Sequence, residues 1–412
     1  MHCVNCGSQV KKGERYCPAC GMEITSSDSI NVENIENIPK ITPSPRVVEK
    51  INTSPRRTGR KIFVIFLIIA IVGSGIFGVV TMMNWGESRG NADYFYTNAS
   101  PSSVESIRFD VGTSDVIINY INSPSPSAPV VEIHLEYYVA GGFVENKAFD
   151  EIFYFNWDNT SAVKEFYLHI KPFVGMIMIQ DTNIYVTLRS DVTYEIDVEV
   201  STGHTMINIP DDAIIDKVTL AGSTGSMEIN AGSNVTFQDT VRATVSTGNI
   251  EISTEDSTFS SDIFATTSTG SIDFNFTNCS FDGDFIVLLS TGSFSMDLYN
   301  SQYQSDHIWD VTTSTGKINV EIYQYLPMLN DITADFETST GDITVDYNGT
   351  NTLAGAQFVS SVSTGNYNYD NLGGFLESNS LFESLGYDSA GNKYTFTMAV
   401  STGDISVTGR SQ

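Results

Sequence analysis

Basic residues are scarce in this sequence. It has 21 Lys and Arg against 49 Asp and Glu, which gives a formal net charge of −28 at pH 7. Residues 1–61 hold ten of the basic and six of the acidic residues, so the rest of the chain holds eleven and 43, a net charge of −32. A segment this acidic repels nucleic acid and anionic lipid headgroups. Nucleic acid is therefore excluded as a partner, and a solvated acidic surface is favoured over a divalent-cation site.

Cysteine is also rare, with five in 412 residues, and Cys279 is the only one beyond position 20. One thiol cannot form an internal disulfide, so a disulfide framework is excluded for most of the chain. The other four, Cys3, Cys6, Cys17 and Cys20, form two CxxC pairs separated by ten residues. Four thiolates on two tight turns favour a closed, structural Zn²⁺ site, with a disulfide pair as the alternative. Residues 1–24 resemble the short zinc ribbon found at the N-terminus of many prokaryotic membrane proteins.

Long hydrophobic runs are absent except for one, at residues 62–83, where 22 consecutive residues carry no charge. A helix of this length spans about 33 Å, enough for a bilayer core of about 30 Å. We therefore predict a transmembrane helix at 62–84, between a disordered basic linker at 25–61 and a short stalk at 85–100. Arg56, Arg57, Arg60 and Lys61 precede the run, so the positive-inside rule predicts a cytoplasmic N-terminus and extracellular repeats. The expected location is the cell membrane, with a single crossing.

The tripeptide Ser-Thr-Gly occurs nine times in the acidic part of the chain. Its serines are Ser201, Ser223, Ser246, Ser268, Ser290, Ser314, Ser339, Ser363 and Ser401. Successive serines are 22, 23, 22, 22, 24, 25, 24 and 38 residues apart, and a period in the twenties is typical of solenoid proteins.

The residues around each tripeptide indicate strands. Mostly apolar residues stand five and three places before each serine, and two and four places after each glycine. Copy 268, for example, has Ile263, Ala265, Ile272 and Phe274. This spacing of two is the period of a strand. The phase slips by one across the tripeptide, so the chain must bend there, and glycine supplies the positive φ of such a corner. A further apolar residue in several copies, such as Phe237 or Phe259, suggests a third side.

These patterns predict a mainly β protein, in which residues 194–412 form a single-chain parallel β-solenoid (β-helix) with one coil per repeat. Residues 101–193 lack the strict period and read as an N-terminal β cap with degenerate coils, which covers an open end. The 38-residue step holds an insertion at 371–392, which either caps the final coil or binds a partner.

The repeats, from about 195 to 407, resemble the β-solenoid domains of prokaryotic envelope proteins that are named adhesins from their shape. The resemblance implies a location and a binding role, and brings no catalytic residues. Four histidines lie beyond residue 61: His134, His169, His204 and His307. They do not recur at one repeat position, so no catalytic constellation can be placed, and we expect no enzyme.

Three functions remain open. We expect a membrane-anchored, adhesin-like cell-surface protein whose extracellular partner, a protein or a glycan, is not specified. A transmembrane envelope-stress sensor is the alternative, in which the zinc ribbon contacts a cytoplasmic protein. A β-helical enzyme acting on glycans is the distant third, since such enzymes need acidic groups gathered at one site.

Overall fold

The computed structural model describes residues 85–98, 101–121, 125, 128–142, 147–171, 177–350, 355–378 and 380–411. The predicted zinc ribbon (1–24), linker (25–61) and transmembrane helix (62–84) lie outside these ranges. Within them, no helix has the length and apolar character needed to cross a membrane. The chain divides into two compact units, Met1–Met82 and Met83–Gln412, and the fold described below is that of the second.

The second unit is mainly β, as predicted, with one four-residue α-helix, α2 (Phe149–Ile152), and one 3₁₀ turn, η1 (Tyr387–Ser389), among the described residues. Its strands, in chain order, are β1 (Trp85–Tyr96), β2 (Glu105–Thr113), β3 (Asp115–Ile121), β4 (Val131–Gly142), β5 (Phe153–Asp158), β6 (Val163–Ile170), β7 (Ile177–Arg189), β8 (Tyr194–Ile209), β9 (Ile214–Ser233), β10 (Thr236–Phe237), β11 (Val241–Thr247), β12 (Ile250–Glu255), β13 (Thr258–Phe259), β14 (Ile263–Thr277), β15 (Ser280–Phe281), β16 (Phe285–Tyr299), β17 (Gln302–Tyr303), β18 (His307–Gln324), β19 (Ile332–Thr340), β20 (Ile343–Gly349), β21 (Gly355–Thr364), β22 (Tyr367–Gly373), β23 (Phe375–Ser378), β24 (Leu381–Ser384), β25 (Lys393–Thr402) and β26 (Ile405–Ser411).

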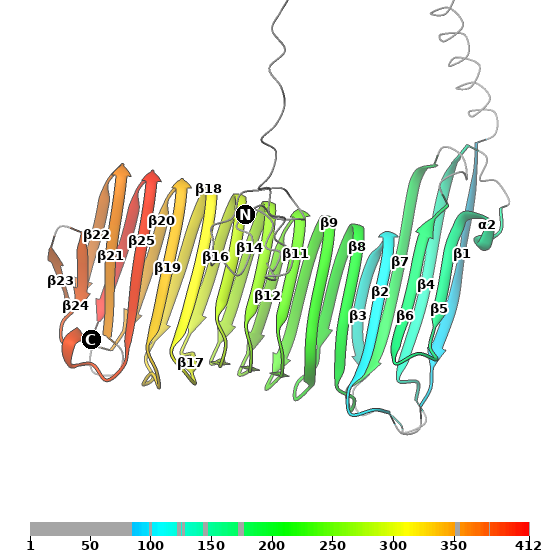
Figure 1. Cartoon of the computed structure of the whole chain (residues 1–412), viewed down its shortest axis with the longest axis horizontal. Coiled ribbons are helices and arrows are strands. Elements are labelled where there is room, and N and C mark those ends of the chain that lie inside the picture. The colour runs from blue at the N-terminus through cyan, green and yellow to red at the C-terminus, as the bar shows by residue number, and fades with distance from the viewer. Residues whose placement is uncertain are drawn as a thin grey trace, which may run out of the picture. The chain divides into compact units, whose positions relative to one another are not determined.

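Successive repeats pair in parallel and in register. β14 and β16, for example, place Ala265 beside Val287, Gly270 beside Gly292, and Ile272 beside Phe294. The half of each copy before the tripeptide pairs with the corresponding halves of its neighbours, and the half after it does the same. All of these strands belong to one 26-stranded sheet, in which they stand in a row (Figure 1). The short strands β10, β13, β15 and β17 form the third side, where the rings of Phe237 and Phe259 stack 4.6 Å apart.

The four apolar columns predicted from the sequence lie in the core. Ile263, Ala265, Ile272 and Phe274 are each at most 1% exposed, and the same positions are buried in most other copies. The exceptions are in the copy at Ser363, where Tyr367 is 40% exposed and Tyr369 is partly buried. This copy stands at the end of the row, so no further coil covers its last strand.

The chain order and the spatial order of the last copies differ. β25 pairs with β19 on one side and with β21 on the other, so the last copy in sequence lies between the copies at Ser339 and Ser363. β26 lies in the same way between β20 and β22. The insertion predicted at 371–392 is not a simple loop, because β23 and β24 form a hairpin within it. β24 also pairs antiparallel with β21 and covers its outer edge, which agrees with the capping alternative.

The N-terminal part of the unit changes from parallel to antiparallel pairing. β2 lies beside β8, parallel to it, with Thr113 opposite Thr202 of the first tripeptide. Beyond it, β6 pairs with β5, and β7 pairs with β4, which pairs with β1, all antiparallel. The segment for which the sequence predicts a stalk, 85–100, therefore contains the edge strand β1. The sequence of β1, WGESRGNADYFY, has no clear apolar alternation and therefore does not predict a strand. The segment is extended because it pairs with β4 along its whole length.

Cys279 is a buried thiol in the short connection between β14 and β15. It is 0% exposed, its Sγ lies 3.7 Å from the carbonyl oxygen of Thr254, and burial raises its pKa to about 12. Because the thiolate is the reactive form, we expect Cys279 to resist alkylation at pH 8 in the folded chain and to react at once in denaturant. The measurement is mass spectrometry of a variant in which the other four cysteines are serine. Rapid labelling without denaturant would contradict the burial.

Candidate functional site

The residues for which the sequence predicts metal binding, Cys3, Cys6, Cys17 and Cys20, lie outside the described residues. The four histidines noted above lie on four different strands and are not brought together. Each faces its own carboxylate: His134 Nδ1 is 2.6 Å from Asp93, His169 Nε2 is 2.7 Å from Asp110, His204 Nε2 is 3.7 Å from Glu228, and His307 Nδ1 is 3.6 Å from Asp284. In the part of the chain that the structure describes, no group of three or more His, Cys, Asp or Glu could hold a metal ion.

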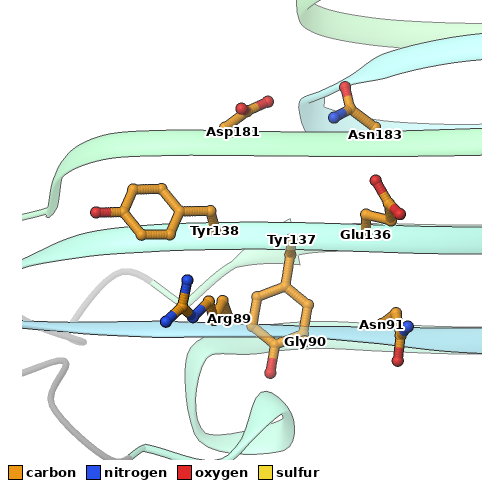
Figure 2. Close-up of a pocket in the computed structure, with 8 residues that line it drawn as sticks. All are labelled: Arg89, Gly90, Asn91, Glu136, Tyr137, Tyr138, Asp181 and Asn183. Atoms are coloured by element: carbon orange, nitrogen blue, oxygen red, sulfur yellow. The ribbon is translucent and has the colours of Figure 1, made fainter.

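A polar pocket of about 450 Å³ lies on the face of three antiparallel strands, β1, β4 and β7 (Figure 2). Its lining comprises Arg89, Gly90, Asn91, Glu136, Tyr137, Tyr138, Asp181 and Asn183. The strand register arranges six of these as two rows across the sheet: Arg89–Tyr138–Asp181 and Asn91–Glu136–Asn183. Directly paired residues share a face of a sheet, so these six side chains face the same way.

The strands beneath this pocket are held by aromatic packing on their other face. Tyr137 lies opposite Gly90, and a Cβ added to Gly90 would come within 3.0 Å of the Tyr137 ring. That ring packs against Phe149 and Phe153, at centroid distances of 5.2 and 5.4 Å. Glycine at position 90 thus allows the ring to lie against the β1 backbone, which fixes the spacing of Arg89 and Asn91.

An ion-pair cluster borders the pocket. His134 lies one row further along, with Asp93 Oδ1 2.6 Å from Nδ1 and Glu136 Oε1 3.4 Å from Nε2. Hydrogen bonding to Asp93 is the main reason that the pKa of His134 is raised, with a smaller contribution from Glu136. The raised pKa means that the imidazolium persists to a higher pH than in an unfolded chain, and its stabilisation is lost as pH rises through the folded pKa. While protonated, His134 donates to Glu136 and orients one carboxylate of the pocket.

The pocket is suited to binding and has no nucleophile held by a base. Arg89 donates only, Asp181 and Glu136 accept, and the amides of Asn91 and Asn183 do both. Such a set recognises a polar ligand with several hydroxyl or amide groups. No sequence pattern indicates this pocket, because its rows depend on antiparallel pairings between strands about 45 residues apart, at 85–96, 131–142 and 177–189.

Comparison with known proteins gives one family match. Residues 2–24 match the zinc-ribbon domain family, which confirms the ribbon predicted at 1–24. Comparison with curated protein sequences gives no match.

Several solved structures are similar over most of this chain. They include a proposed cell adhesion protein from Clostridium sporogenes (10% identity, TM-score 0.23, 78% of this chain and 100% of the other). Proposed adhesins from Parabacteroides merdae (11%, 0.25, 79% and 97%) and Bacteroides fragilis (10%, 0.22, 78% and 97%) are also similar. Similarities this low establish neither a shared fold nor a shared function.

Proposed function

We propose that this chain is a membrane-anchored, adhesin-like interaction protein of the cell surface, with its repeats arranged as a parallel β-solenoid. The observation that carries the proposal is the in-register stacking of coils from β2 to β22, which presents a long, continuous face of outward side chains. At its N-terminal end the same unit adds the open polar pocket on β1, β4 and β7. An extended surface with a ligand-sized pocket is suited to recognition, and nothing in the pocket is arranged for turnover.

The predicted membrane anchor fits this role. A helix at 62–84 would directly precede β1 in the sequence and would anchor the β unit to the membrane. Arg56, Arg57, Arg60 and Lys61, directly before the predicted helix, favour a cytoplasmic N-terminus and therefore an extracellular position for the β unit. A transmembrane sensor remains the second proposal, and it is favoured by the match of residues 2–24 to a zinc ribbon, a small domain suited to contact with cytoplasmic proteins.

Attachment assays separate these two functions. If the protein is an adhesin, deletion of 195–412 should abolish surface attachment by cells that express the chain, whereas deletion of 1–60 should leave it intact. Arg89→Gln should reduce attachment through the pocket, and Lys317→Gln, a loss of the same charge at a side chain 71% exposed among the repeats, should not. A ribbon deletion that alters transcription, with attachment unaffected by either deletion, would favour the sensor.

Membrane topology can be tested directly. Protease added to intact cells should digest the chain beyond residue 90 and spare residues 1–61, because the basic flank of the predicted helix stays inside. The measurement is immunoblotting with tags at each end, and permeabilised cells are the control. Digestion of the N-terminal tag in intact cells would reverse the orientation.

Zinc binding by the N-terminal segment is a separate prediction. The full chain should contain one zinc per molecule, measured by elemental analysis, and Cys17→Ser should lose it, because three thiolates hold Zn²⁺ far more weakly than four. Cys279→Ser is the matched control and should keep the metal. A stoichiometric disulfide among the four N-terminal cysteines in cells would contradict the prediction.

A further inference from the structure

A further row of side chains, separate from the two rows of the pocket on β1, β4 and β7, crosses the C-terminal end of the unit. The register places Tyr299 of β16 beside Tyr323 of β18, Tyr323 beside Asn348 of β20, and Asn348 beside Arg410 of β26. Directly paired residues share a face, so these four side chains lie on one surface. At roughly 4.8 Å per strand, the row is about 14 Å long.

The first half of this row is an aromatic platform. The rings of Tyr299 and Tyr323 lie 6.2 Å apart at 35°, and the ring of Tyr325 meets Tyr299 at 6.1 Å and 64°. Tyr299 is 42% exposed and Tyr325 is 38% exposed. Exposed tyrosines gathered in this way present ring faces and hydroxyl groups together to solvent.

The second half of the row borders a hollow of about 200 Å³. Its lining includes Tyr323, Asp346, Asn348, Leu372, Thr408 and Arg410. Asn348 Oδ1 is shielded from solvent and has no hydrogen-bond partner among the described residues. Arg410 is exposed and takes part in none of the ion pairs found in the described part of the chain. Arg410 thus has hydrogen-bonding capacity available to a ligand, and the amide of Asn348 lines the same hollow.

We propose that this row, from Tyr299 to Arg410, binds a neutral saccharide of about three sugar units; this deepens the proposed function and rests on it. The apolar C–H face of a pyranose packs on a tyrosine ring, and its hydroxyl groups pair with amide, carboxylate and guanidinium groups. Tyr299, Tyr323 and Tyr325 supply the first kind of contact. Asp346, Asn348, Thr408 and Arg410 supply the second.

The charge of the surrounding surface selects a neutral ligand. Six consecutive repeats each place at least one carboxylate on this same face of the sheet: Glu228, Glu251, Asp273, Asp297, Glu321 and Asp346. A polymer with a carboxylate or sulfate on every second sugar would lie against this row and be repelled. Arg410 and Lys317 do not offset six carboxylates, so uronic-acid and sulfated glycans are disfavoured.

The test uses the full chain, purified in a detergent whose headgroup is not a sugar. Neutral trisaccharides of glucose, galactose, mannose or N-acetylglucosamine are titrated by calorimetry, with hyaluronan as the anionic probe. We expect at least one neutral trisaccharide to bind saturably and hyaluronan not to bind. Tyr299→Ser should weaken the binding about fivefold to tenfold, as expected for the loss of one stacked ring. Arg410→Gln should weaken it as well.

Tyr154→Ser is the matched control, since Tyr154 is 50% exposed on β5 at the other end of the unit. Failure of every trisaccharide to bind, preferential binding of hyaluronan, or equal weakening by Tyr154→Ser would each overturn the saccharide site. If no trisaccharide binds while deletion of 195–412 still abolishes attachment, only the ligand class is wrong. If the trisaccharide binds and Tyr299→Ser weakens it, but cells attach without 195–412, the site stands and the adhesin function falls.

Discussion

Replacing Gly270 with Ala should destabilise the repeats by about 4 kcal/mol or more, the range of the most damaging single substitutions. Gly270 has φ +146, and a Cβ at this position would lie 1.8 Å from the carbonyl oxygen of Gly248 in the preceding coil. The clashing atom belongs to the backbone of the stacked corner, so neither residue can move away without breaking the parallel register.

The measurement is the urea midpoint of the full chain, and Gly391→Ala is the matched control. Gly391 precedes β25, and a Cβ there would meet nothing within 4 Å. Its replacement should leave the midpoint unchanged or slightly raised, because alanine restricts the unfolded chain. Similar losses in both variants would mean that the corner glycines are not in contact.

Replacing Ile272 with Asp should cost several kcal/mol, because it buries a carboxylate without a partner. Ile272 is 0% exposed and lies in register between Ile250 of the preceding coil and Phe294 of the following one. We expect either a large fall in the urea midpoint or no folded protein. If Ile272→Asp does not fold, Ile272→Val is measured in its place. It should fold, with a free energy of unfolding about 1 kcal/mol lower than that of the unchanged chain.

Thr247→Ala provides the comparison, because Thr247 belongs to the tripeptide of the previous copy and its side chain is exposed. It should change the free energy of unfolding by less than about 0.5 kcal/mol. Equal tolerance of Asp at position 272 and Ala at position 247 would show that the assigned inward face is wrong.

The sequence predicted the repeats well because one physical pattern recurs in nine copies. An apolar period of two on either side of a glycine corner leaves few ways to bury Ile272 and its equivalents, and those residues are buried. The prediction is wrong for Tyr367, which occupies a core position in the pattern but is 40% exposed, because no copy lies beyond it. Tyr369, in the same copy, is only partly buried and packs against the core. The apolar period shows whether a side chain faces the core or the solvent. It does not show which copy stands at the end of the row of strands.

Features that depend on which distant strands pair could not be predicted, because the repeat pattern is local. That β25 lies between β19 and β21 is a matter of long-range pairing, and Ser401 has the same local sequence whether its coil is last or penultimate. The pocket at Arg89 and Tyr138 depends on antiparallel registers among strands of weak pattern. The row from Tyr299 to Arg410 spans four strands and could be assembled only once the position of β26 was known. The zinc ligands, by contrast, are predicted by local spacing alone.

The position of β25 and β26 has a consequence for synthesis. A chain made from the N-terminus could add one coil after another as each repeat emerges, up to the copy at Ser339. The copy at Ser363 cannot then take its native place, because the segment that must lie between it and its neighbour is made after it. Until residue 411 is available, the edges of β19 and β20 stay open to pairing with the wrong strand or with another nascent chain. Residues 393–411 thus complete the row of strands, and a chain that lacks them exposes the unpaired edges of β19 and β20.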